Sequence, residues 1–177
     1  MKERIALNPM QQSYLRGREA KCGMFSKACF VYEYDPAKVA HDRLVEALQR
    51  LPQLHPLLGA ALDGETLVLG AGRLDIQEVP LWEDGIEAQA EALFQQFTWS
   101  EQCLTQVTLV NGSHAYVVLC INGILADGLS HDRILETLER CCEGEPLEPV
   151  ECSQAFLDYM ETLRDEQHTP EQEQALE

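Results

Sequence analysis

The sequence predicts an α/β sandwich, in which one mixed β-sheet has helices packed on it. Short apolar segments bounded by turn residues indicate more strands than a helical bundle would contain. Segments with helical periodicity are interleaved with these strands. The chain has 177 residues, of which 45% are hydrophobic, and is therefore long enough for one domain with a substantial core.

The first elements are a helix and a strand. Residues 8–18 are expected to form a short helix, because Asn8 is a good N-cap and Pro9 suits the first helical position. Residues 29–34 (CFVYEY) are aromatic and β-branched, which favours a strand.

A longer helix and a hairpin are expected next. Asp35-Pro36 would cap and open the helix, and Pro52 would end it, because the residue before a proline avoids helical geometry. Two apolar runs at 57–62 and 66–69 flank Asp63-Gly64, a dipeptide typical of tight hairpin turns.

The second half is expected to hold the centre of the sheet. A short strand at 76–79 precedes an amphipathic helix at 86–97. The runs 104–110 and 115–121 flank Asn111-Gly112-Ser113-His114, which predicts another hairpin. The second run, AYVVLCI, is apolar on both faces, as in a central strand that is covered on both sides.

A turn and two helices complete the chain. After a turn at 122–128, a helix is expected over 130–142, with Ser130 as its N-cap and Gly144 as its stop signal. A last helix is predicted over 153–167, followed by a polar, acidic tail.

Composition excludes some classes of partner. Thirteen Lys and Arg against thirty Asp and Glu give a net charge of −17, which argues against nucleic acid and anionic membranes. No apolar run reaches the roughly 18 residues of a transmembrane helix, and the N-terminus lacks the apolar region of a secretory signal.

The cysteines predict neither a metal site nor a disulfide framework. The seven residues contain no CxxC pair and no Cys/His cluster with zinc-ligand spacing. Several lie in apolar runs, where free cysteine behaves as a small hydrophobe. We therefore expect buried thiols in a reducing cytoplasm, with Cys120 as a core residue.

The most informative segment is 120–130 (CINGILADGLS), where a buried strand ends in a polar residue and turns into a helix. Such turns are where α/β proteins present functional groups. Asp127 is placed near a helix N-terminus, where the helix dipole stabilises a carboxylate. Asp-Gly before a helix also occurs as simple turn chemistry, and the residues alone leave both interpretations open.

This segment resembles HHxxxDG, the core motif of the condensation-domain superfamily of nonribosomal peptide synthetases. Asn122 and Gly123 correspond to its first two positions, and Asp127 and Gly128 to its last two. In the heterocyclization branch the motif becomes DxxxxD followed by a serine, which corresponds here to Asn122, Asp127 and Ser130.

Three other segments agree in order with that superfamily. Residues 8–18 (NPMQQSYLRGR) resemble the PLQxAYxxGR opening motif of the heterocyclization branch. The segment 55–58 (HPLL) resembles HPxL, and 153–159 resembles an SFRDY-like stretch. The four motifs are distributed in this order over nearly the whole length of the chain.

The resemblance implies one lobe of a chloramphenicol-acetyltransferase-like fold at 1–150, with 151–177 as a helix and acidic tail leading to a second lobe. The whole domain would join two acyl groups held on carrier proteins, and the heterocyclization variant would then cyclise a Cys, Ser or Thr side chain. No bound cofactor is implied. The phosphopantetheine arm of a partner carrier protein would enter between the two lobes.

The candidate catalytic residues are Asn122 and Asp127, in a degenerate motif. Gly123 replaces the histidine tied to amide-bond formation and has no side chain. An asparagine amide forms hydrogen bonds but takes no proton at neutral pH. In the family the aspartate holds the motif loop together rather than reacting.

The candidate substrate- or carrier-binding residues are Tyr14, Arg18, Ser130 and His131. The family's opening helix, with Tyr14 and Arg18, borders the tunnel near the lobe junction. Packing of Tyr14 on the sheet, charge balance at Arg18 and an ordinary surface role for His131 are the simpler interpretations.

Three functional hypotheses follow. The chain is an enzyme fragment that a complementary C-terminal lobe completes, a non-catalytic module that docks on carrier proteins or a synthetase, or a standalone acyltransferase-like protein that dimerises to form its site.

Overall fold

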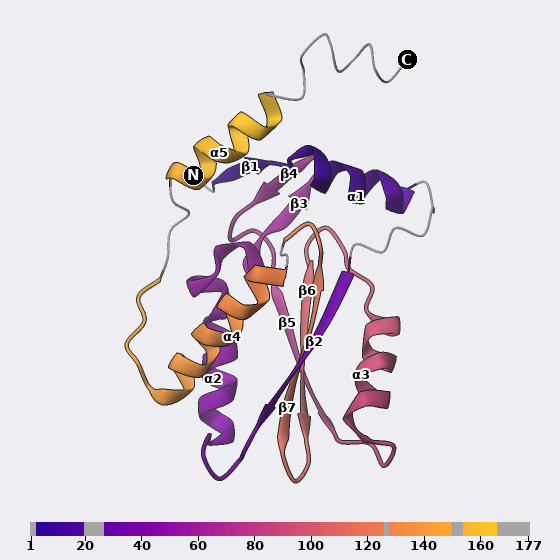
Figure 1. Ribbon diagram of the computed structural model, residues 1–177, viewed down its shortest axis with the longest axis vertical. Coiled ribbons are helices and arrows are strands. Elements are labelled where there is room, and N and C mark those ends of the chain that lie inside the picture. The colour runs from indigo at the N-terminus through magenta and orange to yellow at the C-terminus, as the bar shows by residue number, and fades with distance from the viewer. Residues whose placement is uncertain (1–2, 20–26, 126–127, 150–153, 166–177) are drawn as a thin grey trace.

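The computed structural model describes residues 3–19, 27–125, 128–149 and 154–165, and the predicted α/β class is confirmed (Figure 1). The helices are α1 Pro9–Glu19, α2 His41–Leu54, α3 Gly85–Gln96, α4 Gly128–Glu143 and α5 Gln154–Asp165, with a 3-10 turn at Pro56–Gly59. The strands are β1 Arg4–Ala6, β2 Lys27–Tyr34, β3 Ala61–Asp63, β4 Thr66–Val68, β5 Leu74–Pro80, β6 Thr105–Asn111 and β7 Ala115–Asn122.

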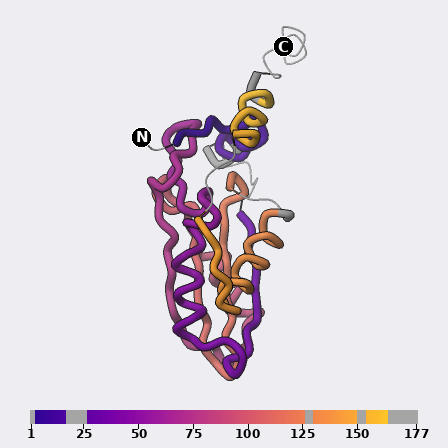
Figure 2. Tube along the Cα trace, turned by 90° about the vertical axis from the view of Figure 1, so that its left-hand side faces the viewer, coloured from indigo at the N-terminus to yellow at the C-terminus, as the bar shows by residue number. Residues whose placement is uncertain are grey.

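The larger sheet has four strands in the order β2-β7-β6-β5. Its β2–β7 and β7–β6 pairs are antiparallel, and β5 runs parallel to β6. Helix α3 packs against β2 and β7 on one face, while α2 and α4 lie side by side over the other (Figures 1 and 2). The predicted central strand is confirmed, because every residue from Val117 to Asn122 is at most 3% exposed.

The expectation of a single sheet is wrong. A second, three-stranded sheet in the order β1-β4-β3 lies at one end of the molecule with α1 and α5 (Figure 1). The predicted hairpin turn is present between β3 and β4, where Gly64 has a φ of +59°. The start of the expected apolar strand is a 3-10 turn instead, because Pro56 opens it.

Helix α2 begins and ends later than expected. Asp35 does not cap it; its carboxylate accepts a hydrogen bond from the Ala37 N–H at 2.9 Å and closes a local turn instead. Pro52 lies inside the helix, which continues to Leu54. Burial of Leu51 and Leu54 on the core face offsets the backbone bond that the proline forfeits.

Helix α4 also differs at its start. It begins at Gly128, so Ser130 is its third residue and not the predicted N-cap. Its end is as predicted, because Gly144 adopts a φ of +86° and donates to the Cys141 carbonyl at 3.0 Å. The predicted division of the chain at residue 150 stays a prediction.

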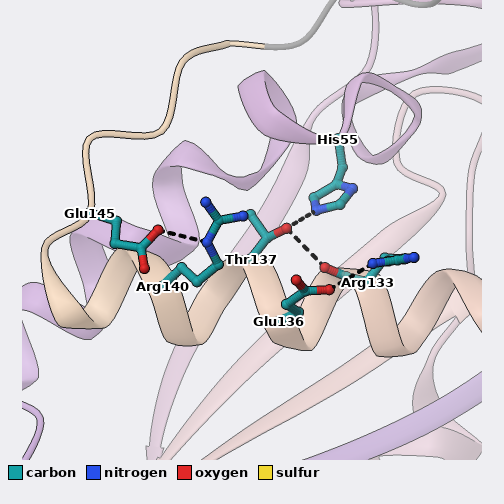
Figure 3. A network of polar contacts seen from close by, with 6 residues as sticks. All are labelled: His55, Arg133, Glu136, Thr137, Arg140 and Glu145. Carbon is teal, nitrogen blue, oxygen red and sulfur yellow. Dashed lines mark hydrogen bonds and ion pairs between the residues drawn. The ribbon is translucent and has the colours of Figure 1, made fainter.

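A polar contact joins the end of α2 to α4 (Figure 3). The His55 Nε2 atom lies 2.9 Å from the Thr137 hydroxyl, which itself donates to the Arg133 carbonyl at 2.8 Å. Because that hydroxyl proton is already used, the His55 ring must donate through a protonated Nε2. The HPxL-like segment therefore has a structural role in this protein.

We predict that His55 makes the protein less stable as the pH falls. Burial lowers the pKa of His55, so the unfolded chain binds the proton more readily than the folded one. The contribution of His55 to stability is therefore fully present above the ordinary histidine pKa of about 6.5. It is lost as the pH falls through the lowered pKa of the folded state. Urea unfolding at about pH 7.5 and about pH 5.5 measures the free energy of unfolding at each pH. The decrease in this free energy between the two pH values should be smaller for His55→Gln than for the wild type.

The matched control is His41→Gln. Hydrogen bonds from the His41 ring to the carboxylates of Glu78 and Asp42 raise the pKa of this exposed histidine, so its contribution to stability is present at low pH and lost as the pH rises. The His41→Gln variant should therefore not reduce the loss of stability on acidification. An equal effect of both substitutions would contradict the role of His55.

Candidate functional site

The motif loop is built on the last residue of β7. The Asn122 N–H donates to the Leu104 carbonyl at 3.0 Å, which completes the sheet at this point. The Asn122 side-chain Oδ1 accepts the Ile124 N–H at 2.9 Å, and its carbonyl accepts the Leu125 N–H at the same distance. Ile124 and Leu125 are both buried, so the loop turns into the core rather than into solvent.

Asn122 is fully buried, with 0% of its surface exposed. Its Oδ1 is used by the loop, and its Nδ2 has no hydrogen-bond partner among the described residues. A buried donor without a partner costs about 1–3 kcal/mol. The amide therefore fixes the loop and presents one unused donor, but it offers no group that transfers a proton.

Asp127 lies outside the described residues, so its role in the loop stays a prediction. Gly123, before it, adds no side chain to the site. Catalytic chemistry at Asn122 also stays a prediction. Within the described part of the motif, the structure thus provides hydrogen bonding but no general base.

Helix α1 is anchored on this loop by Gln11. The Asn8 Oδ1 accepts the Gln11 N–H at 2.9 Å, and the Gln11 Oε1 accepts the Asn8 N–H at 2.9 Å. This capping box confirms Asn8 as the N-cap. The Gln11 Nε2 also donates to the Ile124 carbonyl at 2.6 Å, which joins two segments 113 residues apart. Sequence reasoning missed Gln11 as a site residue, because its partner is a backbone atom that no residue pattern marks.

The other opening-motif candidates lie on the same helix. Tyr14 is half-buried and packs against the core one turn after Gln11, and its contact with a substrate or carrier stays a prediction. Arg18 belongs to α1, but its side chain is outside the described part. Arg16 lies 3.3 Å from Glu65 and forms a surface ion pair.

His131 and Ser130 lie in the first turn of α4. The His131 ring stacks on Phe30 of β2, with centroids 4.3 Å apart and planes inclined by 3°. The Tyr32 hydroxyl donates to the His131 carbonyl at 3.4 Å, and burial raises the pKa of Tyr32 to about 12. His131 is therefore fixed on the edge strand, and its contact with a ligand stays a prediction, as does that of Ser130.

Lys27 stands opposite Asn122 in the β2–β7 ladder. Directly opposed residues point to the same face of a sheet, here the face that α3 covers. The Lys27 ammonium donates to the Phe94 carbonyl at 2.6 Å and lies 4.5 Å above the Phe94 ring. The positive charge of Lys27 therefore stabilises the C-terminal end of α3 and is not directed toward the motif loop.

A pocket of about 800 Å³ lies at the opposite end of the sheet from the motif loop. The end of β2, the start of α2 and the end of α4 line it, with Tyr34, Arg43 and Glu139 among its residues. Within the described ranges, no group of three or more His, Cys, Asp or Glu is arranged to hold a metal ion. No helix in these ranges is long and apolar enough to cross a membrane.

No protein-family model and no curated protein matches this chain. Solved structures do match its fold. The EpoB nonribosomal peptide synthetase cyclization-docking bidomain from Sorangium cellulosum aligns with a TM-score of 0.67 and 21% identity, over 98% of this chain and 37% of that one. The condensation domain from the Monacolin K polyketide synthase MokA aligns with a TM-score of 0.69 and 14% identity, over 92% and 39%.

A third structure concerns condensation domain-mediated chain release from the enacyloxin polyketide synthase. It aligns with a TM-score of 0.58 and 16% identity, over 96% of this chain and 35% of that one. The resemblance to condensation domains is thus confirmed at the level of the fold. The chain spans well under half the length of these structures.

We predict that Gln11→Ala destabilises the loop and the start of α1 together. The substitution removes one half of the capping box and the bond to Ile124, which should lower the free energy of unfolding by about 1–3 kcal/mol. The control is Gln12→Ala, which removes one longer bond of 3.2 Å to the Leu7 carbonyl. Urea unfolding should show a clearly smaller loss for Gln12→Ala, and equal losses would contradict the anchoring role of Gln11.

Proposed function

We propose that this chain is the N-terminal lobe of a condensation-like domain, closest to the heterocyclization branch, and that it binds carrier proteins through their phosphopantetheine arm. The observation that carries this proposal is the hydrogen bond from Gln11 to the Ile124 carbonyl. It brings together two segments that resemble superfamily motifs, on a fold shared with condensation and cyclization domains.

The heterocyclization branch is proposed from the opening motif. The stretch from Asn8 to Arg18 resembles that branch along its length. The capping box between Asn8 and Gln11 gives the first residues of this stretch a defined position above the motif loop. A cyclization domain is among the structures that share the fold.

The composition of the motif loop favours binding over bond formation. The position tied to amide-bond formation is Gly123, and the buried Asn122 carries an amide that neither gains nor loses a proton. The described part of the loop retains one unused hydrogen-bond donor, the buried Asn122 Nδ2, as the proposed partner of an acyl group or an arm. Neither Gly123 nor Asn122 offers a base that would deprotonate an attacking amine.

The proposed partners are a carrier protein and a synthetase module. The chain spans between 35% and 39% of the matched structures discussed above, so a complementary C-terminal lobe would complete the binding tunnel. Two alternatives are a docking module that contacts a synthetase without the arm, and an acyltransferase-like protein that forms its site by dimerising.

The test is a titration of the chain with one carrier protein in its apo and holo forms, followed by fluorescence anisotropy. We expect the holo form to bind at least about tenfold more tightly, because loss of the arm removes on the order of 1.4 kcal/mol or more of binding free energy. Tyr14→Ala should weaken holo binding. Tyr159→Ala, which removes a tyrosine that is 58% exposed on α5, should not.

The other outcomes separate the alternatives. Equal affinity for apo and holo carrier would overturn recognition of the arm and favour a docking module. Amide-bond formation by the chain alone would overturn the non-catalytic assignment. A mass that rises to that of a dimer at working concentrations, with activity only in the dimer, would favour the self-associating protein.

A further inference from the structure

Two cysteines face each other in the centre of the β2–β7 ladder. Cys29 and Cys120 are direct register partners in this antiparallel pair, and their sulfur atoms lie 3.7 Å apart. Both are free thiols in the structure. Cys29 belongs to an edge strand and is half-buried, whereas Cys120 belongs to the central strand and is 3% exposed.

The backbone geometry at this position suits a disulfide. Directly opposed residues of antiparallel strands have Cα atoms about 4.5 or 5.5 Å apart, depending on the type of pair. Both spacings lie within the range of about 4.4–6.8 Å that disulfides span. Side-chain rotation can bring the sulfurs from 3.7 Å to a bond length of about 2.05 Å without separating the strands.

The surroundings assign different roles to the two sulfurs. The hydrogen bond with Cys120 lowers the pKa of Cys29, against the opposing effects of burial and of Glu91. The same hydrogen bond and burial raise the pKa of Cys120. The more exposed Cys29 sulfur is therefore the one of the two that loses its proton more readily, and the thiolate is the nucleophile in thiol oxidation. Cys120 then stands beside it as a resolving thiol.

We propose that Cys29 and Cys120 form an oxidation site that reacts with hydrogen peroxide and closes to a disulfide. The Cys29 thiolate attacks the peroxide oxygen, the O–O bond breaks, and the products are a Cys29 sulfenic acid and hydroxide, which takes up a proton to become water. The Cys120 sulfur then attacks the Cys29 sulfur, the S–O bond breaks, and the sulfenic hydroxyl leaves as a second water after taking up the Cys120 proton. The two sulfurs lose two electrons in total, and the peroxide gains them.

The other described cysteines lack this arrangement. Cys141 and Cys142 are adjacent in sequence and both buried, and neighbouring side chains of a helix point apart. Burial raises the pKa of Cys142 to about 11. The Cys103 thiol is directed to the Thr105 carbonyl at 3.3 Å. We therefore expect the oxidant to select the cross-strand pair.

Closure would act next to the motif loop. Cys120 and Asn122 are two residues apart on β7 and share the face of the sheet that α3 covers. The disulfide would cross-link β2 to β7 two ladder positions from the Lys27–Asn122 pair. This inference does not depend on the proposed function, because it requires only the two strands and their register.

The first experiment treats the folded, reduced chain with hydrogen peroxide and identifies disulfides by peptide mass mapping. We expect one intramolecular bond between Cys29 and Cys120, with the loss of two hydrogen atoms, in the wild type and in the control Cys103→Ser. Cys29→Ser should lower the rate of peroxide consumption by about tenfold or more, because the accessible thiolate is gone. Cys120→Ser should stop at a sulfenic acid on Cys29 that dimedone traps.

A second measurement needs no variant and covers the case in which a substituted core does not fold. The wild-type chain is equilibrated with reduced and oxidised glutathione, both folded and in urea. Closure of the Cys29–Cys120 bond in the folded chain at a lower fraction of oxidised glutathione than in urea supports the site. A disulfide that uses any other cysteine, or closure that is equally easy in urea, overturns it.

Discussion

The structure depends on the burial of one strand on both of its faces. β7 runs through the middle of the four-stranded sheet, and its residues from Val117 to Asn122 are almost completely shielded from water. A strand that is apolar on both faces requires a cover on each side, which α3 provides on one face and α2 with α4 on the other (Figure 1). The end of this strand then fixes where the motif loop begins.

Polar contacts fix the positions of helices that apolar packing alone does not determine. Hydrophobic burial is non-directional, so it holds helices on the sheet without setting their exact position along it. Gln11 sets the position of α1 by donating to the Ile124 carbonyl, and His55 sets the end of α2 against α4 through Thr137. Both contacts use groups that are partly shielded from water, where a hydrogen bond is stronger and its loss costs more.

Local signals in the sequence were sufficient for most elements, and non-local pairing was not. The capping residues of α1, the two hairpins and α3 could be predicted, because their turns and periodicities lie within a few residues. The strand β1 could not, since three residues carry no pattern and its partner β4 is about sixty residues away. The dipeptide Asp35-Pro36 is typical of turns as well as of helix starts, and in the structure it forms a turn.

The same limit applies to the site. The resemblance located the opening helix and the motif loop, but it could not show that Gln11 joins them. Both strands that carry Cys29 and Cys120 were predicted, yet their facing positions follow from the register of a non-local pair. Asp127 and the side chain of Arg18 lie outside the described residues, and their roles remain predictions.

The side chain of Asn122 supplies a hydrogen bond to the motif loop but no charged group. Its Oδ1 must accept the Ile124 N–H for the loop to turn inward, and an asparagine does this without charge. An aspartate at the same place could also accept that bond, but it would bury a negative charge at a fully shielded position, where desolvation is costly. The neutral amide keeps the turn at the cost of one unpartnered donor. Because that donor is fully buried, its observed contribution is to the shape of the loop, and its contact with an arm or acyl group stays a prediction.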